Sequence, residues 1–156
     1  MVASPKVATY DLKPEMSCRE VALEVCKGLA SGNYAFVMCN LAPPDMVGHT
    51  GSYEPTRIAV EATDAAIGEI WESCKSHGYT LFVTADHGNA EKMVDAKGEP
   101  HTAHTCAPVP FIMASNKMKF RPQESSFCLR EVAPTILNCM GLPIPAEMDG
   151  TSLLDL

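Results

Sequence analysis

The chain has 156 residues, of which 46% are hydrophobic and 20% charged, and its formal net charge is −7. This length fits one domain of ordinary size, and the composition is typical of a globular protein and not of a disordered one. No apolar run is long enough to span a bilayer, and the first residues contain no apolar stretch typical of a secretory signal. The acidic balance and the 6% aromatic content argue against a nucleic-acid partner.

The cysteine pattern indicates a reducing compartment. The chain has seven cysteines, an odd number, and no two of them have C-x-x-C spacing. Most lie in apolar stretches, where a free cysteine behaves as a small buried hydrophobe. We therefore expect a cytoplasmic protein without a disulfide framework or a cysteine-bound zinc ion.

The first half of the chain predicts two helices and one strand. Residues 1–16 form an irregular lead-in, and Ser17 followed by Glu20 has the spacing of a capping box at the start of a helix that ends at residues 32–33. The apolar run at 34–40 predicts a strand buried on both faces. A loop follows over 41–54, and a helix over about 55–76 is closed by Gly78.

The second half predicts two more strands and a third helix. Strands are expected at 80–85 and 109–114, with a polar segment at 89–107 that contains a turn at 95–98. A helix is expected over 129–140, with Gly141 just past its end. The alternation of helices and strands predicts an α/β fold with a mostly parallel sheet flanked by helices.

Acidic and histidine side chains gather in three segments next to predicted strands, namely 45–49, 86–87 and 101–104. Ligands of open α/β sheets bind beyond the carboxyl ends of strands. Carboxylate and imidazole groups together suit divalent ions such as manganese, zinc or cobalt. Asp45 and His49, four residues apart, can converge from one helical turn, whereas the adjacent Asp86 and His87 diverge and often serve two ions. Each residue alone could be a solvated loop residue or a cap, but three such groups favour a metal site.

Several motifs resemble the cofactor-independent phosphoglycerate mutase family. The specific ones are Asn40-Leu-Ala-Pro-Pro-Asp-Met-Val-Gly-His-Thr-Gly51, Val83-Thr-Ala-Asp-His-Gly-Asn-Ala-Glu91 and His101-Thr-Ala-His-Thr-Cys-Ala-Pro-Val-Pro110. The lead-in at 4–17 is similar to the same family. The ending at 133–154 resembles the wider alkaline-phosphatase-like metalloenzymes. The resemblance extends over nearly the whole chain.

The resemblance implies an isomerase of glycolysis and gluconeogenesis that interconverts 3-phosphoglycerate and 2-phosphoglycerate. It implies two divalent metal ions, with Mn²⁺ expected and Mg²⁺, Co²⁺ or Zn²⁺ as alternatives, a phosphoserine intermediate, and no need for 2,3-bisphosphoglycerate. It also implies a monomeric parent protein whose partner is its small-molecule substrate. Carried over by motif, the first ion is held by Asp45, His49 and His104, and the second by Asp86 and His87, with His101 as a neighbour and not a ligand.

Two parts of the family pattern have no counterpart in this sequence: the segment with the nucleophilic serine and the inserted substrate-binding domain. We therefore expect residues 1–156 to be the C-terminal segment of the metal-binding phosphatase domain, an incomplete domain that is inactive alone. We assign no catalytic residue in this chain. Ser31, Ser52, Ser73 and Ser115 are interpreted as cap, turn or helix residues.

Two alternatives stay open at this point. One is another phosphomutase or phosphatase of the alkaline-phosphatase superfamily, which the two middle motifs disfavour. The other is a truncated, non-catalytic module that binds metal, which the intact set of Asp and His ligands disfavours.

Overall fold

The computed structural model describes residues 1–122 and 127–155. The chain divides into two compact units. The first unit contains Met1–Tyr79 and His87–Val109, and the second contains Thr80–Asp86 and Pro110–Leu156. Each unit is described by itself.

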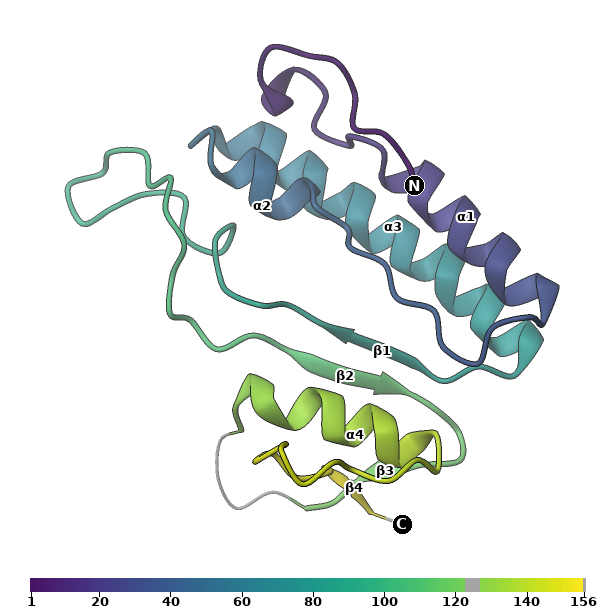
Figure 1. Cartoon of the computed structure of the whole chain (residues 1–156). Helices are drawn as coiled ribbons and strands as arrows, with labels where there is room; N and C mark the ends of the chain where they lie inside the picture. Colours follow the sequence, from purple (N-terminus) through teal and green to yellow (C-terminus); the bar gives the residue numbers. More distant parts are fainter. Residues whose placement is uncertain (123–126, 156) are drawn as a thin grey trace. The chain divides into compact units, whose positions relative to one another are not determined.

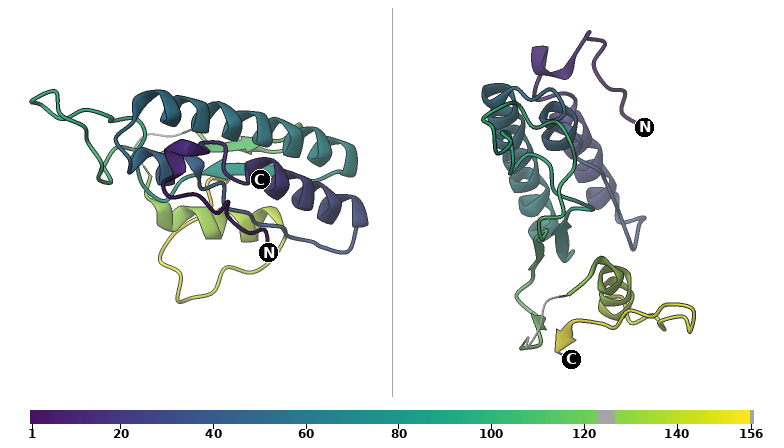
Figure 2. Two further views of the ribbon diagram at one scale, coloured as in Figure 1. Left: turned by 90° about the horizontal axis from the view of Figure 1, so that it is seen from above. Right: turned by 90° about the vertical axis from the view of Figure 1, so that its left-hand side faces the viewer.

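The first unit is built on two long helices. Helix α1 (Cys18–Ser31) packs along α3 (Tyr53–His77), and the short helix α2 (Pro43–Gly48) also packs against α3. Figures 1 and 2 show α1 and α3 lying side by side. A 3-10 turn, η1 (Tyr10–Leu12), precedes them in the lead-in. The core consists of small and aliphatic side chains that repeat at helical spacing: Cys18, Ala22, Val25 and Leu29 of α1, and Ala59, Ala66, Ile70 and Cys74 of α3. Burying a residue such as Leu29 stabilises the unit by about 1.5–3 kcal/mol.

The predicted ends of the two long helices are confirmed. Gly32 and Gly78 cap α1 and α3 with φ of 66° and 76°, in the left-handed region that glycine adopts at little cost. The predicted capping box at the start of α1 is wrong. The Ser17 hydroxyl makes no cap bond and donates instead to the carbonyl of Ala3, 2.7 Å away, which ties the lead-in to the helix.

Helix α2 lies where the sequence predicted only a loop. Pro43 and Pro44 obscured it, because two prolines usually indicate irregular chain. At the start of a helix, however, proline costs nothing, since the first amide groups have no partner within the helix. The prediction of a loop throughout 41–54 is therefore corrected.

The second unit contains the four strands of the described residues. Strands β1 (Leu81–Thr84) and β2 (Phe111–Ala114) pair with each other, and β3 (Lys119–Phe120) pairs with β4 (Leu154–Asp155). The turn η2 (Leu129–Glu131) leads into helix α4 (Val132–Cys139). The hydroxyl of the fully buried Thr135 donates to the Glu131 carbonyl and accepts from the Leu153 amide at 3.1 Å, which fastens the C-terminal segment to α4.

Both described sheets are antiparallel, so the predicted mostly parallel sheet is wrong for the described residues. In the first sheet, Leu81 lies opposite Ala114 and Thr84 opposite Phe111. A parallel pair needs a crossover connection that is usually helical. Residues 85–110, which join β1 to β2, contain no helix, although all of them are described.

Residues 34–40 are described and form no strand, so the strand predicted there is wrong as well. Its apolar side chains Tyr34, Phe36 and Met38 are 56%, 51% and 83% exposed. An apolar run shows that a segment prefers burial, but pairing supplies the hydrogen bonds that make it a strand. The expected strands at 80–85 and 109–114 are confirmed as β1 and β2.

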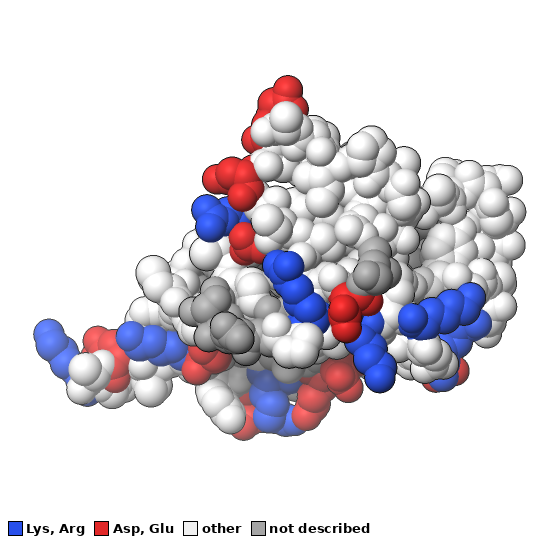
Figure 3. Space-filling model, turned by 90° about the horizontal axis from the view of Figure 1, so that it is seen from below, with Lys and Arg blue, Asp and Glu red and all other residues white. Residues whose placement is uncertain are grey.

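Among residues 1–122 and 127–155, no helix combines the length and the apolar character needed to cross a membrane. On the face seen in Figure 3, the described basic and acidic side chains are interspersed.

Candidate metal centre

Helix α2 places Asp45 and His49 on the same side of one turn. The His49 amide donates to the Asp45 carbonyl at 3.1 Å, so the two residues are one helical turn apart. Side chains at this spacing lie above one another. Asp45 Oδ1 and His49 Nε2 are 3.3 Å apart.

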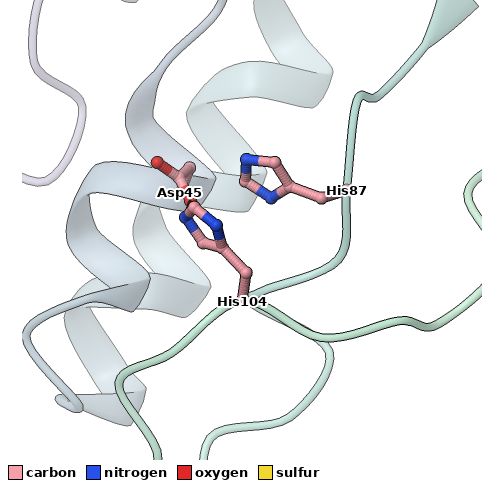
Figure 4. Close-up of side chains that lie close together, drawn as sticks. All are labelled: Asp45, His87 and His104. Carbon is pink, nitrogen blue, oxygen red and sulfur yellow. Dashed lines mark ion pairs between the residues drawn. The ribbon is translucent and has the colours of Figure 1, made fainter.

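The segment 87–109 brings two more histidines to Asp45. His104 Nε2 lies 3.3 Å from Asp45 Oδ1 and 3.0 Å from His49 Nε2. The His87 ring stacks on the His104 ring, with centroids 3.7 Å apart and planes at 21°. Figure 4 shows Asp45 projecting from α2 toward the rings of His87 and His104. We call these four residues the Asp/His cluster; all of them belong to the first unit.

The spacing of three cluster atoms fits a shared cation. Two ligands about 2.1 Å from one ion are about 3.0 Å apart at a right angle and about 3.4 Å apart at the tetrahedral angle. The separations among Asp45 Oδ1, His49 Nε2 and His104 Nε2 are 3.3, 3.3 and 3.0 Å. The ligand atoms of Asp45, His87 and His104 also group together, within 4.8 Å of one another.

The hydrogen bond to the Thr102 carbonyl determines which ring nitrogen of His49 carries the hydrogen. His49 Nδ1 lies 2.7 Å from the carbonyl oxygen of Thr102. A carbonyl can only accept, so Nδ1 carries a hydrogen, and a neutral His49 then has its lone pair on Nε2. That lone pair faces an Asp45 oxygen and His104 Nε2. Metal-binding histidines commonly have their second nitrogen held in this way.

Three further residues support the cluster, and none of them was among the predicted site residues. The Asn89 side-chain amide donates to Asp45 Oδ1 at 2.7 Å. Glu91 accepts from the Asn89 backbone amide at 2.7 Å and from the Thr105 hydroxyl. The hydroxyl donor Thr105 is the main reason that the pKa of Glu91 lies below its usual value. The only signal in the sequence was that Asn89 and Glu91 belong to the motif 83–91.

Gly48 and Gly88 leave the space that the side chains of Asn89 and Thr105 occupy. A Cβ atom on Gly48 would lie 2.5 Å from Asn89 Oδ1, and one on Gly88 would lie 2.2 Å from the Thr105 hydroxyl oxygen. Neither glycine has a positive φ.

Two predicted residues remain, Asp86 and His101. Asp86 is exposed, lies two residues after the end of β1 and belongs to the second unit. His101 is partly buried; its amide donates to the Met93 carbonyl at 2.9 Å, and its Nδ1 has no hydrogen-bond partner among the described residues.

The serines considered in the sequence form local contacts. The hydroxyls of Ser31 and Ser115 bond to backbone groups two or three residues away, and that of Ser73 contacts His77 on the same helix. Ser52 precedes α3 without a side-chain cap bond. None of these four hydroxyls has a hydrogen bond to the Asp/His cluster in the part of the chain that the structure describes.

Residues 1–144 match the Metalloenzyme superfamily. The chain belongs to this superfamily. The cation-like spacing of the Asp/His cluster is what such membership leads one to expect at a metal centre.

Individual relatives confirm the resemblance to the cofactor-independent phosphoglycerate mutases. The 2,3-bisphosphoglycerate-independent phosphoglycerate mutase of Brugia malayi is 56% identical over 99% of this chain and 30% of its own length. The enzyme of the same name from Caenorhabditis elegans is 56% identical, over 99% of this chain and 29% of its own length. A crystal structure of Leishmania mexicana phosphoglycerate mutase at low cobalt concentration has a TM-score of 0.89, with 30% identity, 99% of this chain covered and 31% of that chain. The chain thus spans about 30% of the length of these relatives.

Proposed function

We propose that this chain forms the metal-binding part of a 2,3-bisphosphoglycerate-independent phosphoglycerate mutase. In this proposal it corresponds to the C-terminal segment of the phosphatase domain, and the nucleophilic serine and the substrate-binding domain belong to other parts of the protein. The observation that carries the proposal is the convergence of Asp45, His49 and His104, at 3.0–3.3 Å, in a chain 56% identical to such mutases.

The residues of this chain would hold two divalent ions, with Mn²⁺ as the expected metal. Asp45, His49 and His104 would hold the first, and Asp86 and His87 the second. Such ions, when bound, neutralise phosphoryl oxygens and lower the pKa of an attacking hydroxyl. Three protein ligands leave positions open for a substrate oxygen. The ions would also offset the net charge of −7, which by itself repels a phosphate ester.

Other residues of the chain hold the ligand side chains in their orientations when no metal is bound. The Thr102 carbonyl holds neutral His49 in the tautomer whose lone pair is on Nε2, and Asn89 holds the Asp45 carboxylate. Stacking of His87 on His104 limits rotation of both rings. Ordered ligands lose less conformational entropy on binding, which favours a tight site.

The overall reaction would be the interconversion of 3-phosphoglycerate and 2-phosphoglycerate, a step of glycolysis and gluconeogenesis. We place the protein in the cytoplasm, because all seven cysteines are free, as a reducing compartment keeps them. By itself the 156-residue chain would have no mutase activity, because none of the serines considered above contacts the cluster.

A titration of the chain with Mn²⁺ tests the ligand assignment. Calorimetry measures the heat of binding, and electron paramagnetic resonance measures the free Mn²⁺. His49→Ala should remove the tight site, whereas His87→Ala should keep it, weakened only by the lost stacking on His104, and should lower the stoichiometry. The control is His77→Ala, because His77 bonds within α3 to the Ser73 carbonyl. If His87→Ala removes the tight site and His49→Ala does not, the first ion is held by Asp45, His87 and His104 instead.

A second experiment tests the reaction itself. The native protein that carries this chain should form 2-phosphoglycerate from 3-phosphoglycerate without added 2,3-bisphosphoglycerate, in an assay coupled to enolase. Faster hydrolysis of a generic phosphate ester would favour another enzyme of the superfamily. Sustained 2-phosphoglycerate formation by the 156-residue chain alone would contradict the proposed absence of a nucleophile.

A further inference from the structure

Asn89 holds Asp45 by two hydrogen bonds at once. Its side-chain nitrogen lies 2.7 Å from Asp45 Oδ1 and 3.3 Å from the Asp45 carbonyl oxygen. Asn89 is only 4% exposed, so water does not compete strongly for these bonds. The oxygen it contacts, Oδ1, is the same atom that lies 3.3 Å from both His49 and His104.

The orientation of this amide is fixed by chemistry. If the amide were turned over, its oxygen would face two acceptor oxygens of Asp45, an arrangement that repels. In the observed orientation Asn89 Oδ1 is buried and has no hydrogen-bond partner among the described residues. An unpaired buried acceptor is unfavourable, and natural proteins contain few of them. The side-chain NH₂ group of Asn89 therefore stays on Asp45 although its Oδ1 is left without a partner.

Helix α2 is shaped to receive the amide. Gly48 is buried, and a Cβ atom there would lie 2.5 Å from Asn89 Oδ1 and 3.1 Å from its amide carbon. Contacts this short force a neighbour to move, and the amide is the neighbour. Glycine at this position therefore leaves the space in which Asn89 lies.

A second set of bonds holds the backbone of Asn89. The backbone amide of Asn89 donates to the Glu91 carboxylate, which also accepts from the Thr105 hydroxyl. The backbone amide of Thr105 donates to the Gly88 carbonyl at 2.9 Å. Asn89 is two residues from His87, and Thr105 is next to His104. The bonds thus connect α2 to both histidine-bearing stretches of the segment 87–109.

We infer that Asn89 is a positioning residue that sets the orientation of the Asp45 carboxylate toward the first metal ion, in the space left by Gly48. The inference rests on the proposed function, because it assumes that Asp45 is a metal ligand. Residues that orient metal ligands typically change metal affinity about 10–100-fold when they are replaced.

The test compares Mn²⁺ dissociation constants of the 156-residue chain and three variants, well below their melting temperatures. Asn89→Ala removes both bonds to Asp45 and should weaken binding about 10–100-fold. Gly48→Ala keeps Asn89 but displaces its amide, and it should weaken binding in the same direction. Gly68→Ala is the matched control, because a Cβ atom on Gly68 would meet nothing within 4 Å, and its affinity should equal that of the wild type.

Circular dichroism and apo-state melting separate positioning from stability. If Asn89 only stabilises the fold, Asn89→Ala lowers the melting temperature but leaves the Mn²⁺ affinity within twofold, and the inference is overturned. Asn89→Ser, smaller but still able to donate, replaces the alanine variant if that one does not fold, and should also bind more weakly. A wild-type chain that binds no Mn²⁺ would overturn the proposed function together with this inference.

Discussion

Gly88→Ala is the sharpest test of the bonds that support the metal centre. The added Cβ atom would lie 2.2 Å from the Thr105 hydroxyl oxygen and 2.6 Å from Glu91 Oε1. Glu91 can swing its carboxylate away, but Thr105 is short, β-branched and bridged to Gly88 by a backbone hydrogen bond at 2.9 Å. We expect the bond between Thr105 and Glu91 to break.

The magnitude follows from two contributions. Loss of a hydrogen bond to a charged group costs about 1.5 kcal/mol here, at the low end because Glu91 is exposed. Overpacking by one methyl group adds about 1–3 kcal/mol. The free energy of unfolding of the first unit should therefore fall by about 2.5–4.5 kcal/mol. Gly88 has no positive φ, so backbone strain adds nothing to this sum.

Urea unfolding measures this change through the fluorescence of Trp71, the single tryptophan, which lies on α3 in the same unit. The same substitution is made in a Thr105→Ala background, where the closest clash is absent. There, Gly88→Ala should cost less than about 1 kcal/mol, so the two changes should couple strongly. Equal costs of Gly88→Ala in both backgrounds would show that Thr105 is not the residue that the added methyl group displaces.

Two further predictions concern the second unit. Hydrogen bonding from the Cys128 amide, at 2.7 Å, is the main reason that the pKa of Glu131 is lowered. Its contribution to stability is complete above about pH 4.3, the pKa of an unfolded glutamate, and is lost as pH falls through the lower folded pKa. Glu131→Gln should therefore flatten acid unfolding below about pH 4.3, and an unchanged pH profile would count against this. Thr135→Val keeps the volume but leaves the Leu153 amide unpaired, at a cost of about 1–3 kcal/mol. Hydrogen exchange of that amide should accelerate in Thr135→Val and not in Thr135→Ser; equal protection in both would disprove the role of the hydroxyl.

Features that depend on neighbours in the sequence could be predicted. The long helices followed from apolar side chains at helical spacing, and their ends from Gly32 and Gly78, because both signals are local. The convergence of Asp45 and His49 followed from their spacing in the same way.

Features that depend on distant pairing could not be predicted. The apolar runs located β1 and β2, but strand direction depends on how the connection between them folds, which an apolar run does not encode. Helix α2 was missed because Pro43 and Pro44 are equally compatible with a loop and with the first turn of a helix. Asn89 was missed because its partner Asp45 is 44 positions away in the chain.

The most direct test of the metal centre is a crystal structure of the chain grown with Mn²⁺, with anomalous diffraction data collected to locate the metal. We expect an anomalous peak bonded to Asp45 Oδ1, His49 Nε2 and His104 Nε2, with metal–ligand distances of about 2.0–2.2 Å. We also expect Asn89 to keep its bond to Asp45 in that structure. A well-diffracting crystal with no peak at this position, or with these three side chains directed away from a peak, would show that Asp45, His49 and His104 do not hold a metal ion.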